Sequence, residues 1–280
     1  MSLSKFLPED FDENAVIELI AGKGVYPGET LRKLRRHNLN VKLIAIEGET
    51  EDDLYNQFSE EDRARANVGQ LGRLLKYTKK FGAKYAIMAG QVTPKKLFKG
   101  LVPDLKALTI LATLKERNAE TIFGAIANEL EKVGCKLLDA RSFLDEQIAA
   151  HGFICGRKWN VEERHLLHGL KIAHECARLD IGQSCVVSRG SVLAVEAWEG
   201  TDKMLERAGS FEAKDSLFVK TVKPNQDYRF DVPVIGERTI RKLAASNILN
   251  AAVEAGSVII LEPEKTLELA NKHGIKIFGI

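Results

Sequence analysis

"VIELIAGKGVYPGETLRKLRRHNLNVKLIAIEGE", Val16 to Glu49, decides the fold class of this chain. It begins and ends with short apolar runs, Val16–Ala21 and Val41–Ile46, which have the length of buried strands. Between the two runs, three leucines recur at helical spacing: Leu31, Leu34 and Leu39. The stretch therefore predicts a strand, a glycine turn, a helix and a second strand, which together form a β-α-β unit.

The same pattern follows in "LGRLLKYTKKFGAKYAIMAGQV" (Leu71–Val92), where a helix is expected to stop near Gly82 and a buried strand to follow. Both predicted strands end in Ala-Gly, within Ile20–Gly22 and Met88–Gly90. Two neighbouring parallel strands would end in this way if another group approached their carboxyl ends closely, although a structural turn explains either glycine alone.

Downstream, residues 105–138 read as helical and end in a short strand, "CKLLDA". Further elements are expected as a hairpin of Cys185–Val187 with Val192–Val195, a helix over Asp202–Ala208, and a C-terminal β-α-β unit that contains Pro263 and Gly274. The sequence thus predicts an α/β protein of two domains. Residues 1–143 are expected to form a Rossmann-like domain with a parallel sheet, and residues 144–280 an α/β domain with a mixed sheet.

Composition excludes several classes of protein. The 280 residues are 45% hydrophobic, enough for two cores, and the 29% of charged residues nearly cancel to +2, which argues against a nucleic-acid binder. The four cysteines form no C-x-x-C pair, so reduced thiols are expected. The acidic N-terminus does not resemble a signal peptide, and no apolar run approaches the roughly 20 residues of a membrane span. We therefore expect a cytoplasmic protein.

Acidic residues in two stretches are candidates for chemistry. Glu196 lies inside the apolar run "VLAVEA", where a carboxylate is costly unless it meets a cation or a metal ion. Asp202 follows where a strand passes through a glycine into a helix, so it is either a ligand or a helix cap.

The most unusual stretch is "KPNQDYRFDVPVIG", Lys223 to Gly236. Its two prolines make a helix improbable, so the carboxylates of Asp227 and Asp231, four residues apart, face the same way on an extended segment. The alternation of a half-buried strand would give the same pattern. Because Lys223 and Arg229 lie beside them, we favour phosphoryl chemistry, in which carboxylates hold a hard cation and basic groups hold phosphate.

Four stretches of the chain resemble the LpxI family of UDP-2,3-diacylglucosamine pyrophosphatases. They lie in the right order and span nearly the whole chain: Ile20–Gly28, Leu71–Val92, Leu179–Gly209 and Val222–Ile240. The resemblance is most specific in "DIGQ", "AVEAWEGTD" and "KPNQDYRFDVPVIG". It implies an enzyme of Gram-negative lipid A biosynthesis that splits UDP-2,3-diacylglucosamine into UMP and 2,3-diacylglucosamine 1-phosphate, with Mg²⁺ or another divalent cation as cofactor.

The resemblance also suggests roles for individual residues. We expect Asp227 to be essential, as a magnesium ligand or water-orienting base, while Lys223 and Arg229 contact phosphate. Further metal ligands are expected among Asp231, Glu196 and Asp202. Residues expected to line the substrate pocket are Gly22, Gly24, Gln183, Gly200, Thr201 and Gln226. The site is expected in the cleft between the two domains, where an apolar groove would accept two acyl chains.

The implied partner is a small glycolipid nucleotide, reached by transient contact with the cytoplasmic face of the inner membrane; a homodimer is left open. Two alternatives remain at this point. One is a nucleotide-dependent oxidoreductase, which the glycine turn after the first strand suggests, although Gly22, Gly24 and Gly28 lack the G-x-G-x-x-G spacing. The other is a non-catalytic carrier or sensor of a glycolipid or sugar nucleotide. Metal-dependent release of UMP would separate the hydrolase from both.

Overall fold

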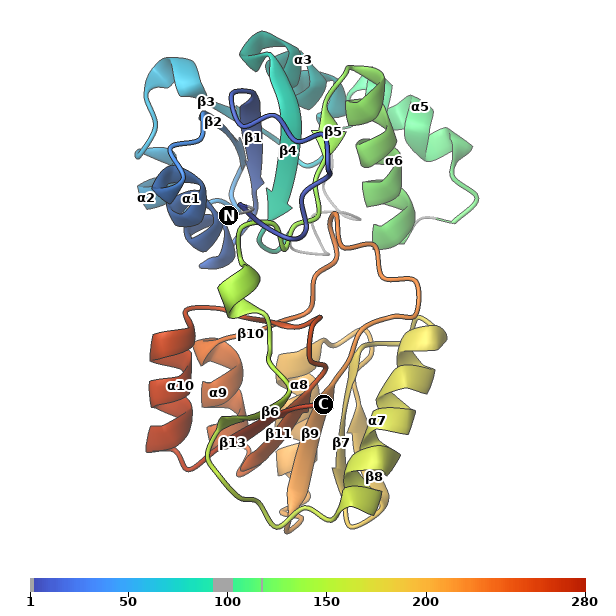
Figure 1. Ribbon diagram of the computed structural model, residues 1–280. Coiled ribbons are helices and arrows are strands. Elements are labelled where there is room, and N and C mark those ends of the chain that lie inside the picture. The colour runs from blue at the N-terminus through green and yellow to red at the C-terminus, as the bar shows by residue number, and fades with distance from the viewer. Residues whose placement is uncertain (1–2, 93–102, 117) are drawn as a thin grey trace. The chain divides into compact units, whose positions relative to one another are not determined.

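The computed structural model describes residues 3–92, 103–116 and 118–280, and the chain divides into two compact units (Figure 1). The first unit contains residues up to Asp145 together with Tyr228–Asp231, and the second contains Glu146–Asp227 and Val232–Ile280. The predicted boundary between residues 143 and 144 places Tyr228–Asp231 in the second domain. The structure packs this segment with the first unit instead, through long-range contacts that no local pattern reveals.

The first unit is built on a parallel sheet whose strands lie in the order β3-β2-β1-β4-β5. Its strands are β1 (Val16–Ala21), β2 (Val41–Ile46), β3 (Arg63–Ala66), β4 (Ala83–Ala89) and β5 (Lys136–Leu137). Its helices are α1 (Tyr26–Arg36), α2 (Asp52–Tyr55), α3 (Leu71–Phe81), α5 (Leu105–Thr113) and α6 (Ala119–Lys132), with a short 3-10 turn at Glu60–Asp62. The predicted Rossmann-like parallel sheet is confirmed, including the adjacency of the two strands that end in Ala-Gly.

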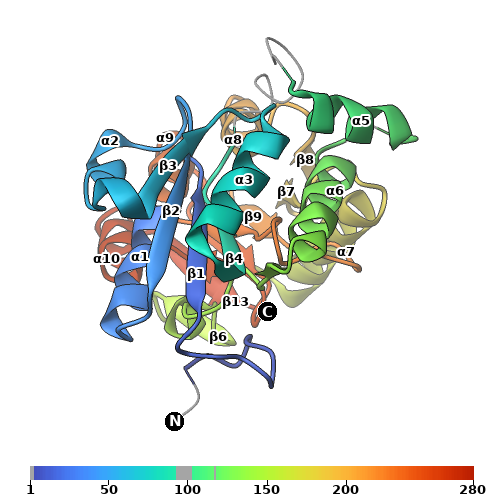
Figure 2. The ribbon, with the colours of Figure 1, turned by 90° about the horizontal axis from the view of Figure 1, so that it is seen from above.

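Helices cover both faces of this sheet, with α1 on one side and α3, α5 and α6 on the other (Figure 2). The core under α3 and α6 includes Ile20, Ile44 and Leu74. The helical region expected over residues 105–138 is divided, because Asp104 caps α5 and Asn118 caps α6 by accepting backbone N–H groups. Arg117, which falls inside that expected region, lies outside the described residues.

An acidic side chain lies within the central sheet of the first unit. Glu18, in the middle of β1, is fully buried, and its Oε1 accepts a hydrogen bond from Thr78 Oγ1 at 3.0 Å. Its other oxygen, Oε2, has no hydrogen-bond partner among the described residues. Burial raises the pKa of Glu18 to about 8, although the bond from Thr78 acts in the opposite direction. Glu18 is therefore largely protonated at neutral pH.

The second unit contains a mixed sheet in the order β6-β13-β11-β9-β7-β8 and a separate pair, β10 with β12. The strands of the larger sheet are β6 (Gly152–Cys155), β7 (Ser184–Ser188), β8 (Ser191–Val195), β9 (Ser216–Lys220), β11 (Asn250–Val253) and β13 (Lys276–Gly279). The two-stranded pair is β10 (Val234–Ile235) and β12 (Ile259–Ile260). The helices are α7 (Glu163–Arg178), α8 (Thr201–Gly209), α9 (Glu237–Ala245) and α10 (Pro263–Lys272), and a 3-10 turn spans Asp145–Gln147.

Helix α7 lies on one face of the larger sheet, and α9 and α10 lie on the other (Figure 1). The predicted hairpin is confirmed as β7 and β8, and its turn residues Arg189 and Gly190 both have positive φ, as a tight hairpin turn requires. The predicted C-terminal β-α-β unit is wrong as a single-sheet motif. Its elements exist, but β12 pairs with β10 while β13 belongs to the larger sheet.

Candidate functional site

Polar side chains gather at one edge of the larger sheet, where β8 and β9 end and β7 begins. Ser184, the first residue of β7, pairs in register with Lys220, the last residue of β9. On its other side, β7 pairs with β8, so that Glu196, directly after β8, donates its backbone N–H to the carbonyl of Ser184. Antiparallel pairing thus places three side chains that are distant in sequence at one edge.

Glu196 is the centre of this group. Its Oε2 accepts a hydrogen bond from Ser184 Oγ at 2.6 Å, and its Oε1 accepts one from Thr201 Oγ1 at 2.6 Å. Burial alone would raise the pKa of Glu196, but the charge of Lys220 and the two hydroxyl donors outweigh burial and hold the pKa below its usual value. Glu196 is therefore ionised at neutral pH, and the cation that its apolar surroundings call for is Lys220.

Lys220 is a functional candidate that is absent from the residues predicted from the sequence. Its side chain is buried, and its Nζ lies 3.9 Å from Glu196 Oε2 and 3.5 Å from Thr201 Oγ1. Both distances are long for a hydrogen bond of a buried ammonium group. The available signal was a lysine that closes the otherwise buried strand "SLFVK". We refer to Ser184, Glu196, Thr201 and Lys220 as the Glu196–Lys220 cluster.

Gly182 brings the preceding loop against this cluster. A Cβ atom at Gly182 would lie 2.3 Å from the carbonyl oxygen of Glu196, so only glycine permits this approach. The next residue, Gln183, accepts a hydrogen bond from the backbone N–H of Thr221 at 2.9 Å. The Thr221 hydroxyl is buried without a partner among the described residues.

The Lys223–Gln226 turn contains two of the predicted site residues. The side-chain oxygen of Gln226 accepts hydrogen bonds from Lys223 N at 2.9 Å and from Gln183 Nε2 at 3.2 Å. The structure therefore brings Gln183, Lys223 and Gln226 together, directly before Asp227. The Lys223 ammonium forms an ion pair with Asp180, the aspartate of "DIGQ".

Other predicted residues take partners outside this group. Asp202 pairs with Arg238 at 2.5 Å, and Arg229 pairs with Glu131 at 3.4 Å. The N-cap of α8 is Gly200, with φ of 78° and no side-chain capping bond, so the capping role considered for Asp202 is wrong. Asp231 belongs to the segment that packs with the first unit.

The carboxylates predicted as metal ligands do not form a preassembled site. Among the described residues, no group of three or more histidine, cysteine, aspartate or glutamate side chains is placed to hold a metal ion. The oxygens of Glu196 already accept two hydroxyl bonds, and Asp202 is paired with Arg238. Asp227, Asp231, Glu196 and Asp202 therefore stay predicted ligands of a divalent cation.

In the first unit, the glycines at the two strand ends approach each other. A Cβ atom at Gly22 would lie 2.6 Å from the Gln91 carbonyl oxygen, and one at Gly90 would lie 2.8 Å from the Lys23 carbonyl oxygen. Lys23 and Gln91 also exchange backbone hydrogen bonds at 2.8 and 3.0 Å. The close approach predicted from the Ala-Gly endings is thus an approach of one strand end to the other. Gly24 has φ of +95° with open space around it.

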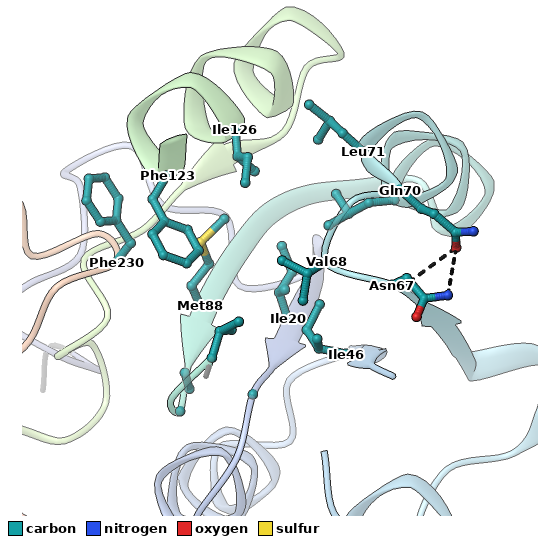
Figure 3. A pocket seen from close by; sticks show the side chains of 15 residues that line it. Ile20, Ile46, Asn67, Val68, Gln70, Leu71, Met88, Phe123, Ile126 and Phe230 are labelled. Atoms are coloured by element: carbon teal, nitrogen blue, oxygen red, sulfur yellow. Dashed lines mark hydrogen bonds between the residues drawn. The ribbon is translucent and has the colours of Figure 1, made fainter. Parts of the chain in front are cut away.

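Beside these glycines, the first unit has an apolar pocket over the carboxyl ends of β1, β2 and β4 (Figure 3). Fifteen of the described residues line it, and none of these is charged. Ile20 and Ile46 come from strands, Phe123 from α6, and Phe230 from the segment that returns to this unit late in the chain. Gly22 lies in the lining of this pocket, and its role as a substrate-binding residue stays a prediction. The expected position of the active site between the domains stays a prediction.

Both halves of the chain match domain families of known proteins. The LpxI N-terminal domain matches residues 16–147, and the LpxI C-terminal domain matches residues 150–278. A protein of Caulobacter vibrioides named UDP-2,3-diacylglucosamine pyrophosphatase LpxI is 30% identical over 231 residues, which cover 78% of this chain and 81% of the relative. In the described part of the chain, no helix has the length and apolar character to cross a bilayer. The two domain matches span most of the sequence in order, and the chain belongs to the LpxI family.

Proposed function

We propose that this protein hydrolyses the diphosphate bond of UDP-2,3-diacylglucosamine to UMP and 2,3-diacylglucosamine 1-phosphate. The observation that carries the proposal is the match over 81% of a relative that bears the name of this activity. The buried Glu196–Lys220 cluster and the neighbouring Lys223–Gln226 turn support it, because they combine a buried cation with hydroxyl and amide groups suited to a diphosphate.

In the proposed reaction, the oxygen of water bonds to one phosphorus atom while the bond from that atom to the bridging oxygen breaks. The bridging oxygen leaves with the other phosphate, and the water proton passes to a base or to the departing phosphate. Asp227 is the proposed base or water-orienting group. Lys220 is the proposed countercharge for non-bridging oxygens, and Glu196 with Thr201 holds its ammonium in place.

Mg²⁺ stays the predicted cofactor, with Asp227 as the leading ligand and Asp231 as a further one. When bound, a divalent cation would neutralise phosphate charge. The substrate is a glycolipid nucleotide, so contact with the cytoplasmic face of the inner membrane and a cytoplasmic location are proposed with it. A homodimer stays an open prediction.

The test is a product assay on UDP-2,3-diacylglucosamine in ¹⁸O-labelled water, with and without a metal chelator. We expect UMP and the sugar 1-phosphate, one ¹⁸O atom in a single product, and loss of turnover with chelator. Asp227→Ala should abolish turnover while the circular dichroism spectrum and product binding persist. Binding without any product would favour a carrier, and near-normal turnover in Asp227→Ala would remove this residue from the mechanism.

A further inference from the structure

We propose that the apolar pocket of the first unit binds one hydrocarbon chain of the acylated substrate and that Phe230 is the residue that makes turnover depend on that chain. The inference rests on the proposed hydrolysis, because it deepens the account of the same substrate. It assigns to the pocket a ligand class that the glycine and carboxylate patterns do not indicate.

The chemistry of the lining points to hydrocarbon. Among the described lining residues, the only polar side chains are Asn67 and Gln70, which are bonded to each other through Asn67 Nδ2 and Gln70 Oε1 at 3.4 Å. A uracil ring in this pocket would depend on Asn67, Gln70 and backbone groups for its carbonyl and N–H partners, and any of its polar groups that these did not reach would be costly to bury. An alkyl chain has no such groups, and each methylene that it buries is worth about a fourfold gain in affinity.

The pocket has a buried floor and a partly exposed rim, as an open-ended chain site requires. Ile20 and Leu71 in the floor are only 6% and 5% exposed. The rim residues Met88, Phe123 and Phe230 are only partly buried, and Figure 3 shows their side chains turned toward the same space. A chain lying there would cover apolar surface that otherwise meets water.

Phe230 is held on this rim by its own ring and by the residue two positions before it. Its ring stacks on Phe123 with centroids 5.7 Å apart and an interplanar angle of 25°. Two residues earlier, the Tyr228 carbonyl accepts a hydrogen bond from Ala140 N at 2.8 Å, and Arg141 Cζ lies 3.4 Å from the centre of the Tyr228 ring. The Tyr228–Asp231 segment is therefore attached to the first unit by backbone and by aromatic contacts.

The same segment begins directly after Asp227. Phe230 lies three positions after Asp227, so their Cα atoms lie no more than about 10 Å apart. A chain that packs against Phe230 therefore contacts a segment that continues into the proposed base. Binding energy from a remote part of a substrate can be used to orient reacting groups, and its loss then lowers kcat rather than raising KM alone.

The first experiment measures ligand binding without turnover, using dansyl-aminoundecanoic acid as a fluorescent alkyl probe on the full chain. Ile126→Trp, which fills the pocket, should weaken probe binding at least tenfold. Phe211→Ala, an exposed phenylalanine of the second unit, is the matched control and should leave binding unchanged. Equal affinity in wild type and Ile126→Trp would overturn the pocket assignment, whether or not the protein hydrolyses the substrate.

The second experiment compares steady-state kinetics with substrates whose acyl chains are shortened in steps. For wild type, kcat should fall as the chains shorten, and Phe230→Ala should flatten this dependence while circular dichroism shows an intact fold. Phe230→Leu keeps an apolar side chain and should retain part of the dependence of kcat on chain length. A dependence on chain length in Phe230→Ala identical to wild type would overturn the role of Phe230. Absence of UMP release by wild type would instead contradict the proposed function.

Discussion

Replacing Glu18 with glutamine should change how the stability of the first unit depends on pH. In the folded protein burial raises the pKa of Glu18 to about 8, whereas the ordinary value is 4.5. Below pH 4.5 both the folded and the unfolded chain hold the proton, so the carboxyl group causes no pH-dependent loss of folding stability. As pH rises from 4.5 to 8, only the unfolded chain releases the proton, and the free energy of unfolding falls.

The size of the effect follows from the same two values. Each pH unit in this interval lowers the free energy of unfolding by about 1.4 kcal/mol. The decrease therefore approaches roughly 3 kcal/mol at pH 7 and levels off near 5 kcal/mol above pH 8. Glu18→Gln keeps an acceptor for Thr78 but cannot ionise. Its new amide donor takes the place of the unpartnered Oε2, which adds a penalty that does not depend on pH.

The chain offers its own spectroscopic probes for this experiment. Both tryptophans belong to the second unit and all five tyrosines to the first. Urea unfolding followed by tyrosine absorbance from pH 5 to 9 therefore reports on the unit that contains Glu18, while tryptophan fluorescence serves as the comparison. Groups near Glu18 are few: Lys42, in register on β2, pairs with Asp62, and the Cys135 thiol has a pKa that burial raises.

We expect wild type to lose stability across this range and Glu18→Gln to lose about 4 kcal/mol less. Parallel curves for the two proteins would show that Glu18 does not stay protonated in the folded state, and would refute the reasoning from its burial. A constant difference in the free energy of unfolding between the two proteins would report only the pH-independent penalty of the buried glutamine amide. The change in the free energy of unfolding with pH, rather than its absolute value, therefore tests whether Glu18 is protonated in the folded state.

Three further predictions concern the Glu196–Lys220 cluster and its surroundings. Lys220→Met should lower kcat 100-fold or more, because the substitution removes a countercharge for the substrate phosphates. Lys203→Met, at an exposed lysine of α8, is the control and should turn over at a near-wild-type rate. Equal rates in the two variants would show that Lys220 does not act on the substrate. The same Lys220→Met change should raise the pKa of Glu196, so that infrared titration of its carboxyl band shifts to higher pH, and an unchanged titration would contradict the assigned cause. Gly182→Ala should cost about 1–3 kcal/mol in urea unfolding followed by tryptophan fluorescence, because the new methyl group meets the Glu196 carbonyl, and unaltered stability would mean that the backbone relaxes freely.

Local patterns predicted most of the elements in this protein. The Val41–Ile46 run coincides with β2, and the helix before Gly82 ends where that glycine adopts the left-handed conformation. The strand β3 has no such signal, because Arg63 and Arg65 alternate with alanines and form no apolar run. The costly position of Glu196 was visible, since a carboxylate inside an apolar run needs a partner. Its partner Lys220 could not be identified from the sequence, because a lysine at the end of a strand is expected to be solvent-exposed.

The sequence by itself determined the α/β class, the parallel sheet of the first unit and the family, because these depend on periodicity and motifs that lie close together along the chain. Only the tertiary structure decided that Lys220 meets Glu196, that Gly22 packs against the end of β4, and that Phe230 returns to the first unit. These contacts join residues far apart in sequence. Their partners are selected by strand pairing and by the burial of side chains against surfaces that exist only after folding.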